Sequence, residues 1–154
     1  MKLDDVEKAV GEILRFRADL LGKMNDLVRT LTEQGVQIAK LQVSALNISY
    51  TGNLANSIEG VFDPASGVGI IKAGAPYAVY VEYGTGIIGK NNPHPTEPWA
   101  YDVSQHGYRG WNFKARDGEW YRTRGQPSRP FMYYTSVELE RICGRVAREV
   151  FGRD

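Results

Sequence analysis

The N-terminal third of the chain decides the fold. Residues 2–50 read KLDDVEKAVGEILRFRADLLGKMNDLVRTLTEQGVQIAKLQVSALNISY and contain no proline. Their apolar side chains recur at alternating steps of four and three once Arg17 and Gln34 are counted in the series, which is a heptad-like helical stripe. We therefore predict a helical region over residues 1–50 that ends by residues 50–53. The stripe consists of Val6, Val10, Ile13, Leu20, Met24, Leu27, Leu31, Ile38, Leu41, Ala45 and Ile48, and a second set, Leu3, Leu14, Leu21 and Val28, widens it.

The length of this region leaves two arrangements open. A single helix over it would be about 70 Å long, which is too long for a compact domain of this size. Gly22 and Gly35 are its strongest helix breakers, each costing about 1 kcal/mol relative to alanine. The region is therefore either two helices that break near one of these glycines, or one long helix that packs on neighbouring subunits. Its apolar face accordingly covers the protein's own sheet or a partner helix.

Strand and turn signals follow this region. Residues 57–62 and 68–73 are two short runs with strand character, joined by the turn sequence DPASG at 63–67, and they predict a β-hairpin. Residues 111–124 predict a second hairpin, because aromatic and β-favouring residues surround an Asp-Gly turn. Residues 77–83 read YAVYVEY, which fits either a strand or a short helical turn.

The C-terminal part is predicted to be a helix over residues 128–152. Ser128 is placed to cap it, and Pro130 suits its first turn. Before it, residues 86–108 hold three prolines and show no periodicity. Loops longer than about 12–15 residues are uncommon in compact domains unless they are functional or mobile. We predict that this insertion is a contact arm or a flexible segment.

These elements predict an α+β fold. A mixed, mostly antiparallel sheet over residues 51–127, with the insertion at 86–108, is packed by the C-terminal helix and preceded by the long N-terminal helical region. The 154 residues fall in the range of one domain, and we expect residues 1–154 to form a single one.

Composition narrows the class of protein. Hydrophobic residues make up 42% and charged residues 24%, which excludes a disordered chain. The formal net charge of +1 gives no case for nucleic acid as the main partner. The single cysteine excludes an internal disulfide and suits a reducing compartment. We expect no membrane span and no secretory signal, because no apolar run is long enough for the first and acidic residues come at once in the N-terminal segment.

Charge is distributed unevenly along the chain. Residues 51–107 carry two basic and five acidic side chains, whereas residues 108–154 carry ten and six. An acidic middle and a basic end are compatible with head-to-tail assembly of identical subunits.

Motifs for catalysis are scarce. The sequence has no glycine-rich nucleotide fingerprint, no P-loop, no paired CxxC and no nucleophile elbow. His94, Glu97 and His106 are the only cluster of metal-ligand type, and they would support a metal-dependent hydrolase if they converged. Since the first two of them lie in a proline-rich loop and not on one face of a helix, we interpret all three as surface loop residues. Cys143 is interpreted as a small apolar filler in a helix. We expect no enzyme activity, metal or cofactor.

The segment 111–124 has a different character. Aromatic and basic residues alternate in it, notably Trp111, Trp120, Arg122 and Arg124. Core packing, a protein interface and a nucleic-acid surface all remain open for it. After residue 70 the chain has nine arginines against three lysines, which favours a protein surface.

Three short motifs resemble a known family. They are Thr51-Gly52-Asn53-Leu54 followed by Ser57-Ile58, then YAVYVEYGT at residues 77–85, and Gly125-Gln126-Pro127 followed by Arg129-Pro130-Phe131-Met132. The order of helix, hairpin, motif, insertion, motif and helix is also similar. The family is the tail-completion, or head-to-tail joining, proteins of long-tailed phages and prophages, the gene-product-ten-like group. The resemblance covers roughly residues 45–150.

The resemblance implies a structural protein of the virion neck or tail. Such proteins form homo-oligomeric rings, here expected to be sixfold, between the head-closure or connector protein and the tail tube or tail terminator. DNA passes through the channel without sequence-specific binding, and before assembly the protein resides in the host cytoplasm. A tail-terminator role, which caps the tube, is the alternative. We further expect the insertion and the 111–124 hairpin to contact a neighbour, so that deleting residues 88–106 abolishes joining while leaving the fold intact.

Physical reasons can be given for several motif residues. Gly84 permits a sharp turn or a close backbone approach, and Thr85 can bond nearby backbone groups. Glu82 lies between tyrosines and needs a partner, for which Arg129 of the same or a neighbouring subunit is a candidate. Pro130 and Phe131 are expected to fix the start of the last helix. The motif and interface candidates are Tyr77, Tyr80, Glu82, Tyr83, Gly84, Thr85, Trp111, Trp120, Arg122, Arg124, Arg129, Pro130 and Phe131.

Overall fold

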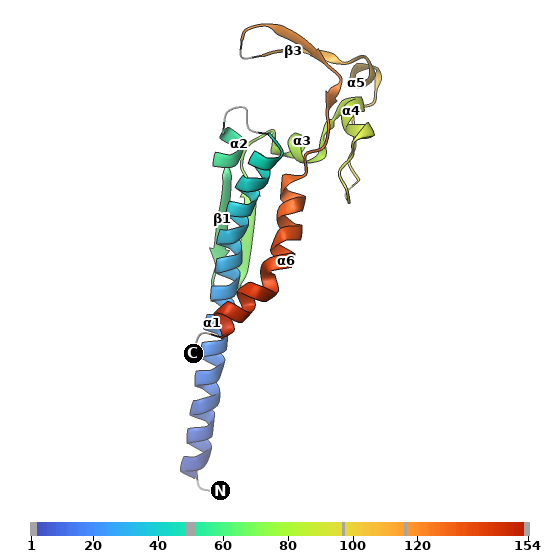
Figure 1. Cartoon of the computed structure of the whole chain (residues 1–154). Helices are drawn as coiled ribbons and strands as arrows, with labels where there is room; N and C mark the ends of the chain where they lie inside the picture. Colours follow the sequence, from blue (N-terminus) through green and yellow to red (C-terminus); the bar gives the residue numbers. More distant parts are fainter. Residues whose placement is uncertain (1–2, 49–51, 97, 116, 153–154) are drawn as a thin grey trace.

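The N-terminal stripe forms one continuous helix, α1 (Leu3–Ala45), of 43 residues. A computed structural model of the chain describes residues 3–48, 52–96, 98–115 and 117–152. At about 65 Å, α1 extends far beyond the rest of the molecule at its N-terminal end (Figure 1). The two-helix alternative is wrong, because a glycine costs a helix only about 1 kcal/mol and the long flanking turns tolerate that loss.

The helix ends at a left-handed residue. Asn47 has a φ of 50°. Its N–H donates to the Ser44 carbonyl at 3.0 Å, and the Ile48 N–H donates to the Val43 carbonyl at 3.1 Å. These are the two hydrogen bonds of a Schellman motif, for which asparagine is one of the few suitable residues. The helix therefore stops at Ala45, earlier than predicted, and residues 49–51 lie outside the described residues.

One side of the C-terminal half of α1 is covered by the first hairpin. Strands β1 (Ile58–Asp63) and β2 (Val68–Ala73) pair antiparallel from Ile58 with Ala73 to Asp63 with Val68, as predicted. The hairpin lies close on α1, since a Cβ added to Gly69 would come within 2.0 Å of the Thr32 hydroxyl oxygen. A short helix, α2 (Asn53–Asn56), joins α1 to this hairpin.

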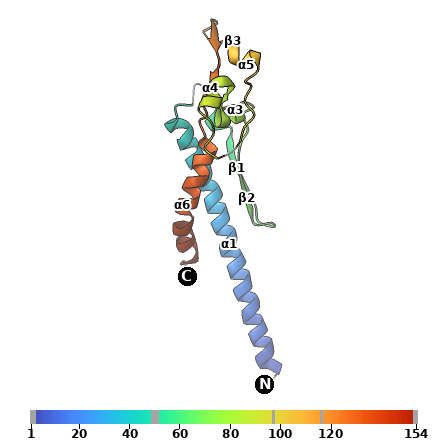
Figure 2. The same ribbon diagram turned by 90° about the vertical axis from the view of Figure 1, so that its right-hand side faces the viewer.

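The other side is covered by the C-terminal helix, α6 (Phe131–Phe151), which runs antiparallel to α1 (Figures 1 and 2). Ile142, Val146 and Val150 are buried there against Leu27, Leu31 and Ile38 of the α1 stripe. A second cluster lies where α1, α2, β1, α3 (Ala78–Tyr83) and α6 meet. Its buried members are Ala39, Val43, Leu54, Ile58, Ala78, Val81 and Phe131.

The end of the molecule opposite the N-terminus carries the remaining elements (Figure 1). They are α4 (Gly86–Asn91), α5 (Gln105–Arg109), β3 (Trp111–Lys114), β4 (Trp120–Thr123) and β5 (Gly125–Gln126). Strands β3 and β4 form the second predicted hairpin, with Trp111 opposite Thr123 and Lys114 opposite Trp120.

The α+β class is confirmed, and its details differ from expectation. Strands β1 to β4 make two separate two-stranded antiparallel sheets instead of one mixed sheet, and β5 belongs to neither of them. The YAVYVEY segment is helical, because its buried residues Ala78, Val81 and Glu82 are spaced three and four apart. The insertion at 86–108 contains α4 and α5 and is partly folded.

Candidate functional site

The motif that follows α3 is a crossing of two backbone segments. Residues Thr85 and Gly86 form isolated antiparallel bridges with Gln126 and Gly125. Gly84 has a φ of 80°, and a Cβ there would lie 2.6 Å from the Ser128 nitrogen. The prediction of a close backbone approach is therefore confirmed. The Thr85 hydroxyl accepts a hydrogen bond from the Gln126 N–H at 3.2 Å, as expected for a side chain that bonds nearby backbone.

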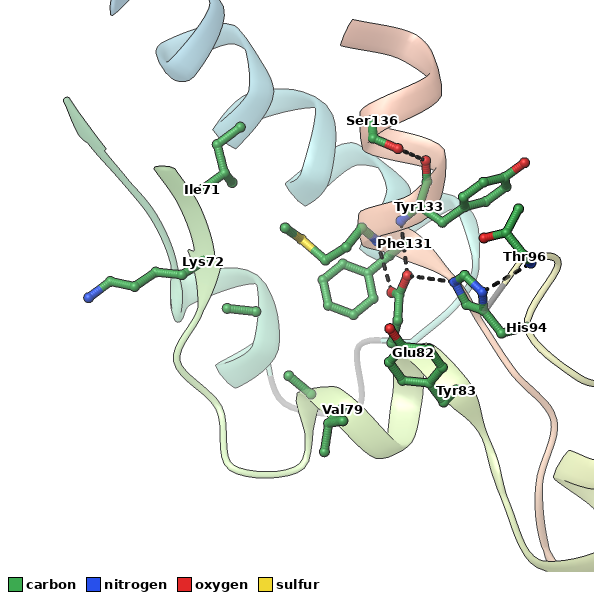
Figure 3. Close-up of a pocket in the computed structure, with 13 residues that line it drawn as sticks. Ile71, Lys72, Val79, Glu82, Tyr83, His94, Thr96, Phe131, Tyr133 and Ser136 are labelled. Atoms are coloured by element: carbon green, nitrogen blue, oxygen red, sulfur yellow. Dashed lines mark hydrogen bonds and ion pairs between the residues drawn. The ribbon is translucent and has the colours of Figure 1, made fainter. Parts of the chain in front are cut away.

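Glu82 is the buried acid of this region, with 7% of its surface exposed. Its Oε2 accepts a hydrogen bond from the Met132 N–H and its Oε1 accepts one from the Tyr133 N–H, both at 2.9 Å. Figure 3 shows this carboxylate between His94 and the first turn of α6. The first N–H groups of a helix have no partner within it and carry partial positive charge. Glu82 therefore caps α6 from a distance of 50 residues along the chain.

Two expectations about this helix start are wrong. Ser128 does not cap α6, because its hydroxyl donates to the Glu82 carbonyl and the helix begins only at Phe131. Arg129 is not the partner of Glu82 within the chain, because the amides of α6 reach the carboxylate instead. Arg129 contributes its N–H to the Val81 carbonyl at 2.9 Å.

His94 is the second buried polar residue of the site, also 7% exposed. Its Nε2 lies 3.3 Å from Oε1 of Glu82, and its Nδ1 accepts a hydrogen bond from the Thr96 N–H at 3.3 Å. Because Nδ1 is an acceptor, the neutral ring carries its proton on Nε2 and donates it to Glu82. The interpretation of His94 as a surface loop residue is wrong.

Aromatic rings surround this pair. The His94 ring lies 4.8 Å from the Tyr83 ring and meets the Tyr133 ring edge-on at 5.4 Å between centroids. Trp99 stacks on the Tyr83 ring, with 4.7 Å between the two ring centroids. The Tyr101 hydroxyl donates to the Tyr83 carbonyl at 3.0 Å. The insertion is thus anchored on the motif at His94, Trp99 and Tyr101.

This anchoring overturns one sequence expectation. Deleting residues 88–106 would remove His94, the partner of the buried Glu82. It would also remove Trp99 and Tyr101, which contact Tyr83. The Asn92 carbonyl, which accepts the Ser128 N–H at 3.1 Å, would be lost as well. That deletion would damage the fold, so it cannot isolate a contact function.

A milder change measures the anchor. Replacing Tyr101 with phenylalanine removes the hydroxyl that bridges the Tyr83 carbonyl and the His94 N–H. We expect the free energy of unfolding to fall by about 1–2 kcal/mol, because two hydrogen bonds of about 1 kcal/mol or less each are lost. Urea unfolding of the wild type and Y101F checks this, with Tyr108→Phe as control because Tyr108 is 65% exposed. Equal stability of all three proteins would contradict the anchoring role.

An open pocket of about 640 Å³ adjoins the pair (Figure 3). Strand β2, helix α3, the first turns of α6 and two residues of the insertion, His94 and Thr96, line it. Two of the polar residues that line the pocket, Glu82 and His94, already bond each other, and Glu82 bonds the helix amides as well. The arrangement therefore acts chemically as a helix cap that fixes α3, the insertion and α6 relative to one another.

The proposed metal ligands are only partly described. Glu97 and the side chain of His106 lie outside the described residues. In the described part of the chain, no three histidine, cysteine, aspartate or glutamate side chains are grouped so that they could hold a metal ion. His94 uses both ring nitrogens for hydrogen bonds within the protein.

The β3–β4 hairpin presents aromatic and basic side chains outward. Trp120 is 68% exposed, and Phe113 and Tyr121 are also exposed. Arg122 and Arg124 are exposed as well, and Arg122 donates to the Arg109 carbonyl at 2.6 Å. Trp111 at the base is half-buried. Core packing, one of the three interpretations left open for this segment, is thus limited to its base.

The tip of this hairpin is fixed by Asp117. Its carboxylate accepts hydrogen bonds from the Glu119 N–H at 2.9 Å and the Tyr121 hydroxyl at 2.7 Å. These bonds, the Glu119 N–H first, lower the pKa of Asp117, and the bond to Asp117 raises the pKa of Tyr121. The tip is consequently most ordered when Asp117 is ionised and Tyr121 is neutral.

The structure thus separates the candidate residues into three groups. One lies in and next to the β3–β4 hairpin and consists of Trp111, Trp120, Arg122 and Arg124. Glu82, Tyr83, Gly84, Thr85, Arg129, Pro130 and Phe131 meet around the start of α6, with Phe131 1% exposed. Tyr77 and Tyr80 lie on the outer side of α3 at 41% and 50% exposure. Trp99, Tyr101 and the pairing of His94 with Glu82 escaped the sequence analysis, because no local pattern marks contacts between segments this far apart.

No family model, curated protein or solved structure matches this chain. None of the described helices combines the length and the hydropathy needed to cross a membrane.

Proposed function

We propose that this chain is a structural protein of the neck of a long-tailed phage or prophage virion. It acts as a tail-completion or head-to-tail joining adaptor that forms a ring, sixfold in our proposal, around the DNA channel. Three ordered motifs support the proposal through their resemblance to that family.

One structural observation carries the proposal furthest. The β3–β4 hairpin stands away from the main body (Figure 1) and exposes Phe113, Trp120 and Tyr121 together with arginines. Large exposed aromatic and arginine side chains are the usual composition of protein interfaces. A hairpin that projects in this way is suited to reach a neighbouring subunit or another neck protein.

The distribution of charge fits a ring. Ring contacts are heterologous, so each subunit must present two different surfaces that match each other. The segment 51–107 has more acidic than basic side chains, and the segment 108–154, which includes the projecting hairpin, has more basic ones. The acidic segment of one subunit would then attract the basic segment of the next. The channel of the ring admits DNA without sequence-specific binding.

The buried Glu82 has a supporting role in this proposal. By capping α6 and holding His94, it sets the direction in which the insertion and the projecting hairpin leave the body. The motif residues around it build the fold, and the exposed hairpin makes the contacts.

The test uses Trp120→Ala in the phage or prophage that encodes the chain. Since Trp120 is 68% exposed, we expect unchanged thermal stability but a loss of joined particles, with separate heads and tails seen by electron microscopy. Tyr134→Ala is the control, because Tyr134 is 40% exposed on α6, away from the hairpin. Normal joining with Trp120→Ala would contradict the proposal.

Cryo-electron microscopy of the particles would separate the two related roles. A subunit density between the connector and the tail tube supports joining, whereas density that ends the tube on unjoined tails supports the terminator role.

A further inference from the structure

The N-terminal half of α1 carries large apolar side chains and projects from the body (Figures 1 and 2). Ile13 and Phe16 are 65% and 69% exposed. Such a row of exposed apolar residues on one helix is unusual for a surface that only meets water. The large apolar residues exposed on this half are Val6, Val10, Ile13, Leu14, Phe16, Leu20, Leu21 and Met24.

The row has the repeat of a coiled coil. With heptad positions written abcdefg, Val10, Arg17 and Met24 fall at a, and Val6, Ile13 and Leu20 at d. On the outer face, every c position from residue 5 to residue 33 is acidic, and three f positions are basic. The c residues are Asp5, Glu12, Asp19, Asp26 and Glu33, and the basic f residues are Lys8, Arg15 and Arg29.

The same seam is already a helix–helix contact further along. Leu27, Leu31 and Ile38 continue the a and d series and pack against α6. Helix α6 ends at Phe151, and the N-terminal part of α1 projects beyond it (Figure 1). Residues 4–22 of α1 are exposed apart from the half-buried Gly11. The exposed row is thus the direct continuation of an established helical interface.

The width of the row indicates how many helices it meets. A two-stranded coiled coil needs apolar residues only at a and d. Here Leu14 and Leu21 add the e position on one side, and Phe16 adds the g position on the other. A helix that is apolar at a, d, e and g presents two adjoining seams, one to each of two neighbours.

We propose that residues 4–24 of α1 pack against the same residues of two neighbouring copies, in a parallel helical bundle that stands beside the DNA channel and does not enclose it. This inference rests on the proposed function for the parallel orientation, because rotation about a ring axis keeps helices along it parallel. It adds the specific contact that would hold the subunits together.

The charges agree with this packing. In a parallel bundle, the g position of one helix faces the e position of the next. Phe16 then meets Leu21 of the neighbouring copy, and Ala9 meets Leu14 of the neighbouring copy, so no like charges face each other at these g and e positions. Lys23, the next g residue, is held at 3.5 Å by Asp19 of its own helix. Arg17 is the polar residue in the seam, and such a residue fixes the register of the helices.

The first experiment measures association of the purified full-length chain by sedimentation. We expect concentration-dependent multimers larger than dimers. Ile13→Asp and Phe16→Asp should each raise the midpoint concentration more than about tenfold, because burying a carboxylate in an apolar seam opposes association. The control Ala18→Asp places the same charge at the outer b position and should change the midpoint less than about twofold.

Thermal unfolding followed by circular dichroism checks that the variants fold, which we expect because Ile13 and Phe16 are both exposed in the single chain. A second measurement tests orientation. A pyrene label on Asp4→Cys, with Cys143 replaced by serine, should give excimer fluorescence only if the N-terminal ends lie together.

The outcomes separate this inference from the proposed function. A monomeric wild type, multimers that resist both aspartate variants, or multimers without excimer fluorescence would each overturn the helical contact. Multimers that dissociate in the aspartate variants would support the helical contact. Normal joining of Trp120→Ala particles would contradict the joining role and would leave that support for the helical contact unchanged.

Discussion

Replacing Gly125 with alanine is expected to lower the free energy of unfolding by more than about 3 kcal/mol. Gly125 has a φ of 109°, a conformation that side chains disfavour, and a Cβ there would lie 1.9 Å from the Thr85 carbonyl oxygen. Both sides of this contact are backbone, so neither can move without breaking the bridges of Thr85 with Gln126 and Gly86 with Gly125. Urea unfolding of G125A measures the loss.

Gly118 supplies the matched control. It also has a positive φ, 88°, but its Cβ would meet nothing within 4 Å, because it lies at the tip of the projecting hairpin. Gly118→Ala should therefore cost only the conformational term, about 1 kcal/mol. If both substitutions cost the same, the backbone crossing at Gly125 does not hold the motif in place.

Local signals predicted the elements whose causes are local. The hairpin at 57–73 follows from two short runs around DPASG, and the structure adds that Asp63 bonds the Ala65 and Ser66 N–H groups and the Ser66 hydroxyl. The hydroxyl bond is the main reason that the pKa of Asp63 is lowered. The hairpin at 111–124 is explained in the same way by Asp117.

The points at which the long helix breaks or ends were harder to predict, because tertiary packing can outweigh the local cost of a helix-breaking residue. Gly35 was a possible helix break, yet it is buried where a Cβ would come within 2.2 Å of the Ile71 side chain. The glycine allows β2 to pack closely on α1, and the stabilisation from this packing outweighs the cost of the low helix propensity of glycine. Conversely, the long stripe suggested a helix to residue 50, and a left-handed Asn47 ended it earlier.

The site itself depends on contacts that no short pattern records. Glu82 needed a partner, and its charge suggested Arg129. In the structure its partners are the backbone N–H groups of Met132 and Tyr133 in the first turn of α6. Backbone groups are present at every position, so the sequence does not mark these two as partners. Only the three-dimensional path of the chain, set by the crossing at Gly84 and Gly125, brings these groups together.

Replacing Glu82 with glutamine is expected to destabilise the protein by about 2–4 kcal/mol. The carboxylate accepts from two amides and is close to His94 Nε2, whereas a carboxamide offers one oxygen and turns an NH₂ toward a donor. One buried N–H then lacks an acceptor, at about 1–3 kcal/mol, and the favourable charge at the helix N-terminus is also lost. The melting temperature should fall by roughly 10 °C.

Glu138→Gln is the control for this change, because Glu138 lies on the same helix, paired with Arg141 on its surface, and should leave the melting temperature unchanged. Hydrogen exchange locates the effect. In E82Q the Met132 and Tyr133 amides should exchange faster than in E138Q, because their acceptor is weakened. If E82Q lowers the melting temperature while these two amides keep their protection, Glu82 stabilises the protein by another route. The start of α6 would then be held by packing of Phe131 alone.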